Sequence, residues 1–117
     1  MESLTELVSE LNSLIKDFRF EEALNRFYDE DAILVENENS PVMGLVNYRV
    51  AAKKFIGNTN NYFAILKNVI VSDSISVSEW HYEFDHKEWG KWARTQISVQ
   101  RWKNGKIVHE RHHYSTN

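Results

Sequence analysis

The chain has 117 residues, of which 42% are hydrophobic and 13% aromatic, so we expect one domain (1–117) with ample apolar surface for a core. Its net charge of −3, with acidic and basic residues interspersed, argues against a nucleic-acid-binding protein, which needs a basic stripe. The absence of cysteine excludes disulfides and thiol chemistry. No stretch approaches the roughly 20 apolar residues of a membrane span, and residues 1–6 do not resemble a signal peptide, so we expect a soluble, cytoplasmic protein.

Three helices are predicted in the first half of the chain. The first begins at a capping box, Ser3-Leu4-Thr5-Glu6, and apolar residues continue at helical spacing as far as Phe18. The second is expected over 20–28, and the third over 45–56 with Gly57-Asn58 as its C-cap. The segments between these helices are a helix break at 29–31, a short strand at 32–36 and a loop at 37–44.

The second half of the chain is predicted to consist of strands. Residues 62–71 and 75–84 are rich in β-branched and aromatic side chains, and a closing hairpin over 96–114 turns at Asn104-Gly105. The order α-α-β-α-β-β-β-β predicts an α+β domain. In this domain the three helices pack on the concave face of a strongly curved antiparallel sheet.

The closing hairpin is the most informative segment, because one of its faces mixes polar and aromatic side chains. Such a mixture is typical of a strand that lines a pocket. The residues on this face are Gln96, Ser98, Gln100 and Trp102.

The register of the hairpin decides which side chains of the last strand join that face, since a slip of one residue exchanges the whole set. A two-residue loop, Asn104-Gly105, would add His109, Arg111 and His113. A three-residue loop over 103–105, with a left-handed Gly105, would instead add Val108, Glu110, His112 and Tyr114. We favour the three-residue loop because it groups Val108 and Tyr114 with Trp102 and leaves Arg111 outside.

The same alternation of side chains decides which residues of the neighbouring strands point inward and which point outward. Trp80, Tyr82 and Phe84 should point inward. Short and β-branched side chains suit packing between two sheets, so the outer face is a candidate homodimer interface. Its proposed residues are Ala93, Thr95, Ile97 and Val99.

Three segments carry a resemblance to a known family: 28–32, 40–44 and, above all, Arg101-Trp102-Lys103-Asn104-Gly105-Lys106-Ile107-Val108. With the element order, they resemble the nuclear transport factor two-like superfamily, and within it small SnoaL-like (polyketide cyclase-like) and ketosteroid-isomerase-like proteins. The resemblance implies a cone-shaped domain, a deep pocket between sheet and helices, and a homodimer across the outer sheet face. It does not imply one activity, because this fold carries isomerases, dehydratases, cyclases, hydrolases and non-enzymatic binders.

Glu36 is the first candidate catalytic residue. Its position resembles that of the general-base aspartate of ketosteroid isomerases, and burial against an apolar cone would raise its pKa toward the range useful for proton transfer. Alternatively, Glu36 lies at the pocket rim, solvated or hydrogen-bonded to the loop at 37–40. Steroid isomerisation itself is not expected, because the first helix has no tyrosine and Ser98 stands where a protonated acid would be needed.

His112 is the second candidate, paired with Glu110. If both point inward, they form with Gln96 and Ser98 a polar floor in which His112 could act as a general acid or base. The alternative is a hydrogen-bonded network that satisfies buried polar groups. The remaining histidines do not converge, so neither a metal nor a cofactor is expected.

The leading interpretation is a protein that binds a small hydrophobic molecule. The expected pocket residues are Tyr48, Trp80, Tyr82, Gln96, Ser98, Gln100, Glu110 and Tyr114. The first alternative is a cofactor-free isomerase, cyclase or dehydratase that uses Glu36 and His112 as acid and base on a small carbonyl compound. The second alternative is an interaction module that acts through the outer sheet face.

Overall fold

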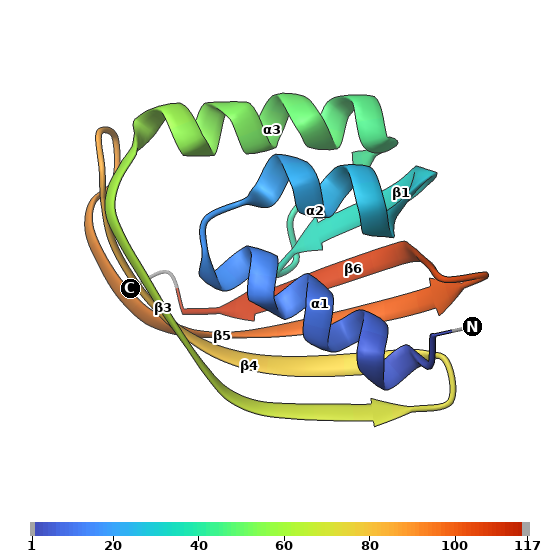
Figure 1. Cartoon of the computed structure of the whole chain (residues 1–117). Helices are drawn as coiled ribbons and strands as arrows, with labels where there is room; N and C mark the ends of the chain where they lie inside the picture. The colour runs from blue at the N-terminus through green and yellow to red at the C-terminus, as the bar shows by residue number, and fades with distance from the viewer. Residues whose placement is uncertain (1, 116–117) are drawn as a thin grey trace.

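The computed structural model describes residues 2–115 and contains helices on the concave side of a curved sheet (Figure 1). The long strands bend around the end of α3. The elements are α1 (Leu4–Lys16), α2 (Phe20–Phe27), β1 (Tyr28–Glu36), β2 (Val42–Met43), α3 (Leu45–Asn58), β3 (Thr59–Ser72), β4 (Ile75–His86), β5 (Gly90–Lys103) and β6 (Lys106–Tyr114).

The sheet has the strand order β2-β1-β6-β5-β4-β3. Its consecutive strands β3 to β6 are antiparallel, as predicted, because short turns join them. One pair departs from the antiparallel pattern, since β1 runs parallel to β6. These two strands come from distant parts of the chain, and no local sequence pattern determines their relative direction.

The first helix begins as predicted, with a complete capping box. The Ser3 hydroxyl accepts the Glu6 N–H at 3.2 Å, and the Glu6 carboxylate accepts the Ser3 N–H at 3.1 Å. The buried side of α1 faces β3 and α2, and its residues Val8, Leu11, Leu14 and Ile15 belong to the hydrophobic core. This packing forms one wall of the space under the sheet.

Two predicted boundaries differ from the structure. The second helix ends at Phe27, before the predicted helix break, but residues 29–31 already belong to β1, whose pairing with β6 shifts register between Tyr28 and Ile33. Helix α3 continues through Gly57 to Asn58 because side chains satisfy its last carbonyls. The Asn58 amide donates to the Lys54 carbonyl at 2.7 Å, and the Thr59 hydroxyl donates to the Phe55 carbonyl at 2.6 Å.

The predicted three-residue turn of the closing hairpin was wrong. Lys103 pairs with Lys106, and the two loop residues both have positive φ: Asn104 at 53° and Gly105 at 76°. These angles are those of a type I′ turn, whose twist matches the flanking strands. The partner of Trp102 is therefore Ile107, which is fully buried, and not Lys106, as the three-residue loop would require.

A β-bulge beyond this turn restores the predicted assignment of side chains to the two faces of β6. Trp102 pairs with Ile107 but Arg101 pairs with His109, so Val108 is an extra residue in β6. The extra residue has the same effect on register as a longer loop would have. The pairs that follow are Gln100 with Glu110, Ser98 with His112 and Gln96 with Tyr114.

The two faces of β4 and β5 follow the predicted alternation. Trp80, Tyr82 and Phe84 are buried. On the outer face Ala93 and Thr95 are exposed, while Ile97 and Val99 are half-buried. A homodimer or another interaction through these four residues stays a prediction.

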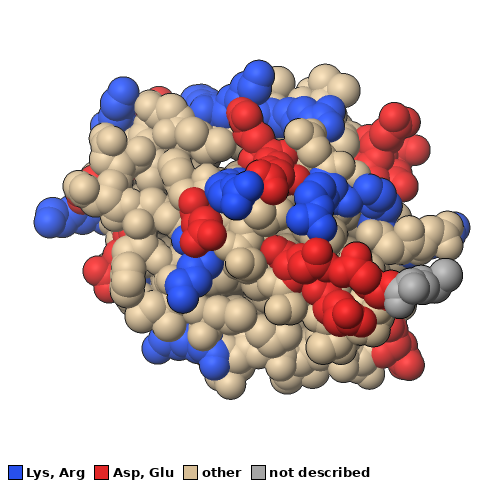
Figure 2. Space-filling view, viewed as in Figure 1, with Lys and Arg blue, Asp and Glu red and all other residues tan. Residues whose placement is uncertain are grey.

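Charged side chains of both signs are interspersed on the face shown in Figure 2. No helix within residues 2–115 is long and apolar enough to cross a membrane.

The tight turn between β5 and β6 should be sensitive to its glycine. Gly105→Ala introduces a Cβ at a left-handed φ of 76° and should lower the free energy of unfolding by about 1–2 kcal/mol. Gly57→Ala is the matched control: it lies in the last turn of α3 with open space around it, and should raise stability by about 0.5–1 kcal/mol. Urea denaturation of both variants tests the pair, and equal effects would contradict the role of the turn.

Candidate functional site

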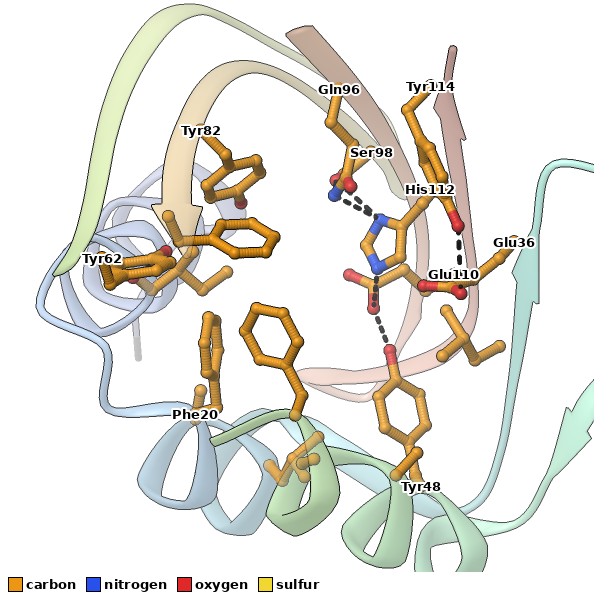
Figure 3. Close-up of a pocket in the computed structure, with 18 of the residues that line it drawn as sticks. Phe20, Glu36, Tyr48, Tyr62, Tyr82, Gln96, Ser98, Glu110, His112 and Tyr114 are labelled. Atoms are coloured by element: carbon orange, nitrogen blue, oxygen red, sulfur yellow. Dashed lines mark hydrogen bonds and ion pairs between the residues drawn. The ribbon is translucent and has the colours of Figure 1, made fainter. Parts of the chain in front are cut away.

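The concave face of the sheet and the helices enclose a cavity of about 200 Å³ (Figure 3). Most of its wall is aromatic or aliphatic, and its polar groups gather on β5, β6 and the end of β1. The aromatic residues of the wall are Phe20, Tyr28, Tyr48, Phe55, Tyr62, Tyr82, Phe84, Trp89, Trp92 and Tyr114. A small cavity with a few convergent polar groups is the usual form of a ligand site.

The carboxylate of Glu110 lies at the floor of this cavity and is 2% exposed. Its Oε2 accepts hydrogen bonds from the Tyr28 hydroxyl at 2.8 Å and from the Gln100 amide at 2.5 Å. Its Oε1 accepts the Tyr48 hydroxyl. These donors come from β1, β5 and α3, so one buried charge connects three separate elements with β6.

His112 lies two residues further along β6 and joins the same network. Its Nε2 is 3.4 Å from Oε1 of Glu110, and its Nδ1 is 2.8 Å from the Ser98 hydroxyl and 3.1 Å from the Gln96 amide. The Gln96 side-chain amide can donate from its nitrogen to an unprotonated Nδ1. If the amide is rotated by 180°, its oxygen can instead accept a hydrogen bond from a protonated Nδ1. Both ring nitrogens of His112 are therefore occupied by protein groups.

The environment shifts the pKa values of this pair in opposite directions. Burial alone would raise the pKa of Glu110, but the charge of His112 and hydrogen bonds from His112, Tyr48 and Gln100 outweigh it and lower that pKa. Burial alone would lower the pKa of His112, but the charge and hydrogen bond of Glu110, together with the charge of Glu36, raise it. Glu110 is thus a carboxylate and His112 favours the imidazolium form.

The two buried tyrosines of the floor act as hydrogen-bond donors. Burial, followed by the negative charge of Glu110, raises the pKa of both Tyr28 and Tyr48 well above the ordinary value. Both hydroxyls consequently stay protonated at neutral pH.

Glu36 ends β1 and lines the cavity, opposite His112 in the β1–β6 ladder. Its Oε2 accepts the Tyr114 hydroxyl at 3.2 Å, and among residues 2–115 this is the only hydrogen bond to the carboxylate. Glu36 is half-buried, which agrees with the alternative of a partly solvated place at the pocket rim. The hydrogen bond from its side chain to the loop at 37–40 is not among those of the described residues, although its backbone carbonyl accepts the Asn39 N–H at 2.9 Å. Glu36 is thus the cavity carboxylate with unused acceptor capacity.

Two predicted pocket residues do not line the cavity. Trp80 is 1% exposed and packs in the core, where its ring stacks on Tyr82 at 5.5 Å. Gln100 is 1% exposed; its oxygen accepts the Ser76 hydroxyl at 2.7 Å and its amide reaches Glu110 from behind. Both point to the predicted face of the sheet but are covered by neighbouring side chains, which the alternation along a strand does not reveal.

Sequence reasoning missed Tyr28 and much of the aromatic wall. Tyr28 had been placed on the inner side of the second helix, whereas it is the first residue of β1 and a donor to Glu110. A signal was available, because a buried tyrosine needs a partner for its hydroxyl. Trp89, in the turn between β4 and β5, is 55% exposed but also stacks on His86 at 3.7 Å and lines the cavity.

No group of three or more His, Cys, Asp or Glu side chains within residues 2–115 is arranged to hold a metal ion. On the outer face, His81 instead contacts Glu83 through Nε2 at 2.8 Å.

No family model and no curated protein matches the sequence, but solved structures are similar. A protein described as a SnoaL-like polyketide cyclase from Mesorhizobium loti has a TM-score of 0.85 at 16% identity, covering 95% of this chain and 98% of that one. An NTF2-like protein from Cytophaga hutchinsonii gives 0.77 at 13% identity, covering 97% and 100%. A protein with a ketosteroid-isomerase-like fold from Catenulispora acidiphila, solved in complex with trimethylamine, gives 0.69 at 14% identity, covering 80% and 74%. The predicted fold is confirmed, and at these identities the likeness extends to the fold alone.

The opposite pKa shifts give the Glu110–His112 pair a defined pH range. The stabilisation from His112 is complete below its ordinary pKa of 6.5 and is lost as the pH rises through its raised folded pKa. The stabilisation from Glu110 is present above its ordinary pKa of 4.5 and is lost as the pH falls through its lowered folded pKa. The pair therefore stabilises the protein most between these two ordinary values.

Replacing the His112 imidazole should abolish the loss of stability that the wild type shows as the pH rises above this range. His112→Gln leaves a buried carboxylate without its counter-charge and should cost about 3 kcal/mol near pH 6. The difference from the wild type should shrink as the pH rises toward 9, because the wild type then loses the same charge. Urea denaturation at several pH values measures this difference. His113→Gln, on an exposed histidine of the same strand, controls for the loss of an imidazole, and a difference independent of pH would contradict the ion pair.

Proposed function

We propose that this protein, whose fold is that of the NTF2-like and SnoaL-like proteins, binds a small, largely apolar molecule in its cavity. The observation that carries the proposal is an aromatic cavity that ends in a polar floor with its hydrogen bonds already made. A floor of this kind does not need a ligand for its own stability, and it leaves the wall free to take up apolar surface.

The cavity size limits the ligand. An apolar cavity of about 150 Å³ can hold benzene, so the present volume of about 200 Å³ suits a single-ring compound with a short substituent. Trp89 and Tyr62 belong to the wall and bring large ring surfaces to such a ligand. A neighbour of the same fold has been solved in complex with trimethylamine, which is also a small organic molecule.

Binding is favoured over catalysis by His112 because of how this residue is held. A general acid or base must reach the ligand with a ring nitrogen, and both nitrogens of His112 contact protein groups. Glu110 accepts from three other side chains and has a lowered pKa, which makes it a weak base. The two residues work better as a fixed polar floor than as a proton relay.

Filling the cavity should abolish binding without unfolding the protein. Ala52 lies half-buried on α3 and lines the cavity, so Ala52→Phe would place a ring in the ligand's volume. We expect the wild type to show raised melting temperatures with some members of a panel of small hydrophobic ketones, amines, acids and polyketide fragments, since binding stabilises by mass action. The Ala52→Phe variant should lose these shifts.

The matched control is Val46→Phe on the exposed side of the same helix, which does not line the cavity and should keep every shift seen with the wild type. If no compound changes the melting temperature of the wild type, or if Ala52→Phe responds as the wild type does, the proposal fails.

The second candidate is a cofactor-free isomerase, cyclase or dehydratase acting on a small carbonyl compound. It is favoured by Glu36, which lines the cavity and keeps lone pairs for accepting a proton. His112 would then act through Ser98, whose hydroxyl lies 2.8 Å from Nδ1 and can donate its own hydrogen to a ligand oxygen.

Glu36→Gln separates this candidate from simple binding. For an enzyme, the variant should keep the thermal shift caused by a carbonyl ligand but lose turnover of that ligand by a factor of roughly 10² or more, because its amide cannot take up a proton. Turnover is followed by chromatography of the ligand after incubation. Absence of any product with the wild type would leave binding as the function.

A further inference from the structure

The side chains that line the cavity carry more negative than positive charge. Among the described residues, those lining the cavity include Glu36, Glu110 and His112 and no lysine or arginine. Glu110 and His112 form an ion pair, so their charges compensate each other locally. The remaining charge is the carboxylate of Glu36, and a ligand therefore meets a negative site within an aromatic wall.

The geometry around Glu36 suits a hydrogen-bond donor. The carboxylate has about four acceptor sites, and Tyr114 uses one of them at 3.2 Å. A carboxylic acid as ligand would bring a second negative charge beside the first, which is unfavourable in a partly buried site. A donor group, above all a positively charged one, would instead gain a charge-assisted hydrogen bond.

Aromatic rings stand next to this carboxylate. The Tyr114 ring, whose hydroxyl binds Glu36, packs edge-on against Trp92 with ring centroids 5.4 Å apart. The face of an aromatic ring attracts cations, most strongly in tryptophan. The Trp92 ring is itself already engaged, by the guanidinium of Arg94 at 3.9 Å from its centroid and by the stacked ring of Phe84 at 5.5 Å. An ammonium group would therefore meet the other rings of the wall, such as Tyr48 and Tyr114. Arg94 is not one of the residues that line the cavity.

We propose that the ligand is a small organic amine, protonated at neutral pH, whose ammonium group donates to Glu36 while its apolar part lies against the aromatic wall. This inference rests on the proposed function, because it requires the cavity to be a ligand site. It goes beyond that function by naming the charge of the ligand and the residue that selects it. Glu36 is then the specificity-determining residue of the cavity.

Three probes with one skeleton test the sign of the charge: benzylamine, benzyl alcohol and benzoate. At pH 7 they present a cation, a neutral hydroxyl and an anion beside similar rings. We expect benzylamine to bind the wild type roughly tenfold more tightly than benzyl alcohol, and benzoate to bind most weakly. Titration calorimetry measures the three affinities.

Glu36→Gln tests the residue. It should reduce the affinity for benzylamine by roughly tenfold and change that for benzyl alcohol by less than about twofold, since the amide keeps the shape and an acceptor for Tyr114 but not the charge. The unchanged affinity for the alcohol also shows that the variant is folded around the cavity. Glu38→Gln, an exposed glutamate in the following loop, is the matched control and should change none of the affinities.

The outcomes separate this inference from the proposed function. If benzyl alcohol or benzoate binds as tightly as benzylamine, or if Glu36→Gln leaves amine affinity unchanged, the amine inference is wrong while the cavity remains a ligand site. If none of the three probes binds and the wider panel also gives no thermal shift, the ligand site itself is refuted and the amine inference falls with it.

Discussion

A carboxylate removed from water constrains this structure more than any other single group. An ionised Glu110 in an apolar interior costs several kcal/mol unless donors and a counter-charge surround it. The chain meets this demand with two tyrosine hydroxyls, one amide and one imidazole. Because these partners belong to β1, α3, β5 and β6, they can meet only when helix and sheet have assembled correctly. The polar floor thus specifies the fold as well as the cavity.

The same constraint divides the cavity into two chemical regions. Glu110 and His112 saturate each other and their neighbours, so they contribute rigidity and little net charge to a ligand. Glu36 has a single tyrosine partner and keeps its charge available. From the sequence alone, Glu36 and His112 are interpreted as an acid–base pair. In the structure the two residues differ in the number of protein partners, because both ring nitrogens of His112 contact protein groups whereas the Glu36 carboxylate accepts one hydrogen bond among the described residues. The part of the site that we propose to select the ligand is consequently the less buried one.

Much of the fold and part of the site followed from local patterns in the sequence. The capping box at Ser3 and the hairpin around Gly105 predicted their elements because both depend on neighbours in the chain. The parallel pairing of β1 with β6 joins residues about eighty positions apart, and no local pattern encodes it. For the same reason Tyr28 was missed: its value as a donor depends on Glu110, which reaches it only through that pairing.

The bulge at Val108 affects how this strand can be compared with those of related proteins. The chain carries one residue here that has no partner in the ladder, and every side chain beyond it keeps its face only because of that surplus. A relative with an unbulged strand would present its cavity residues one position earlier. An alignment without a gap at Val108 would then match Glu110 with a side chain on the opposite face of the sheet. Related proteins therefore have to be aligned at this site by superposing their backbones, and not by sequence position alone.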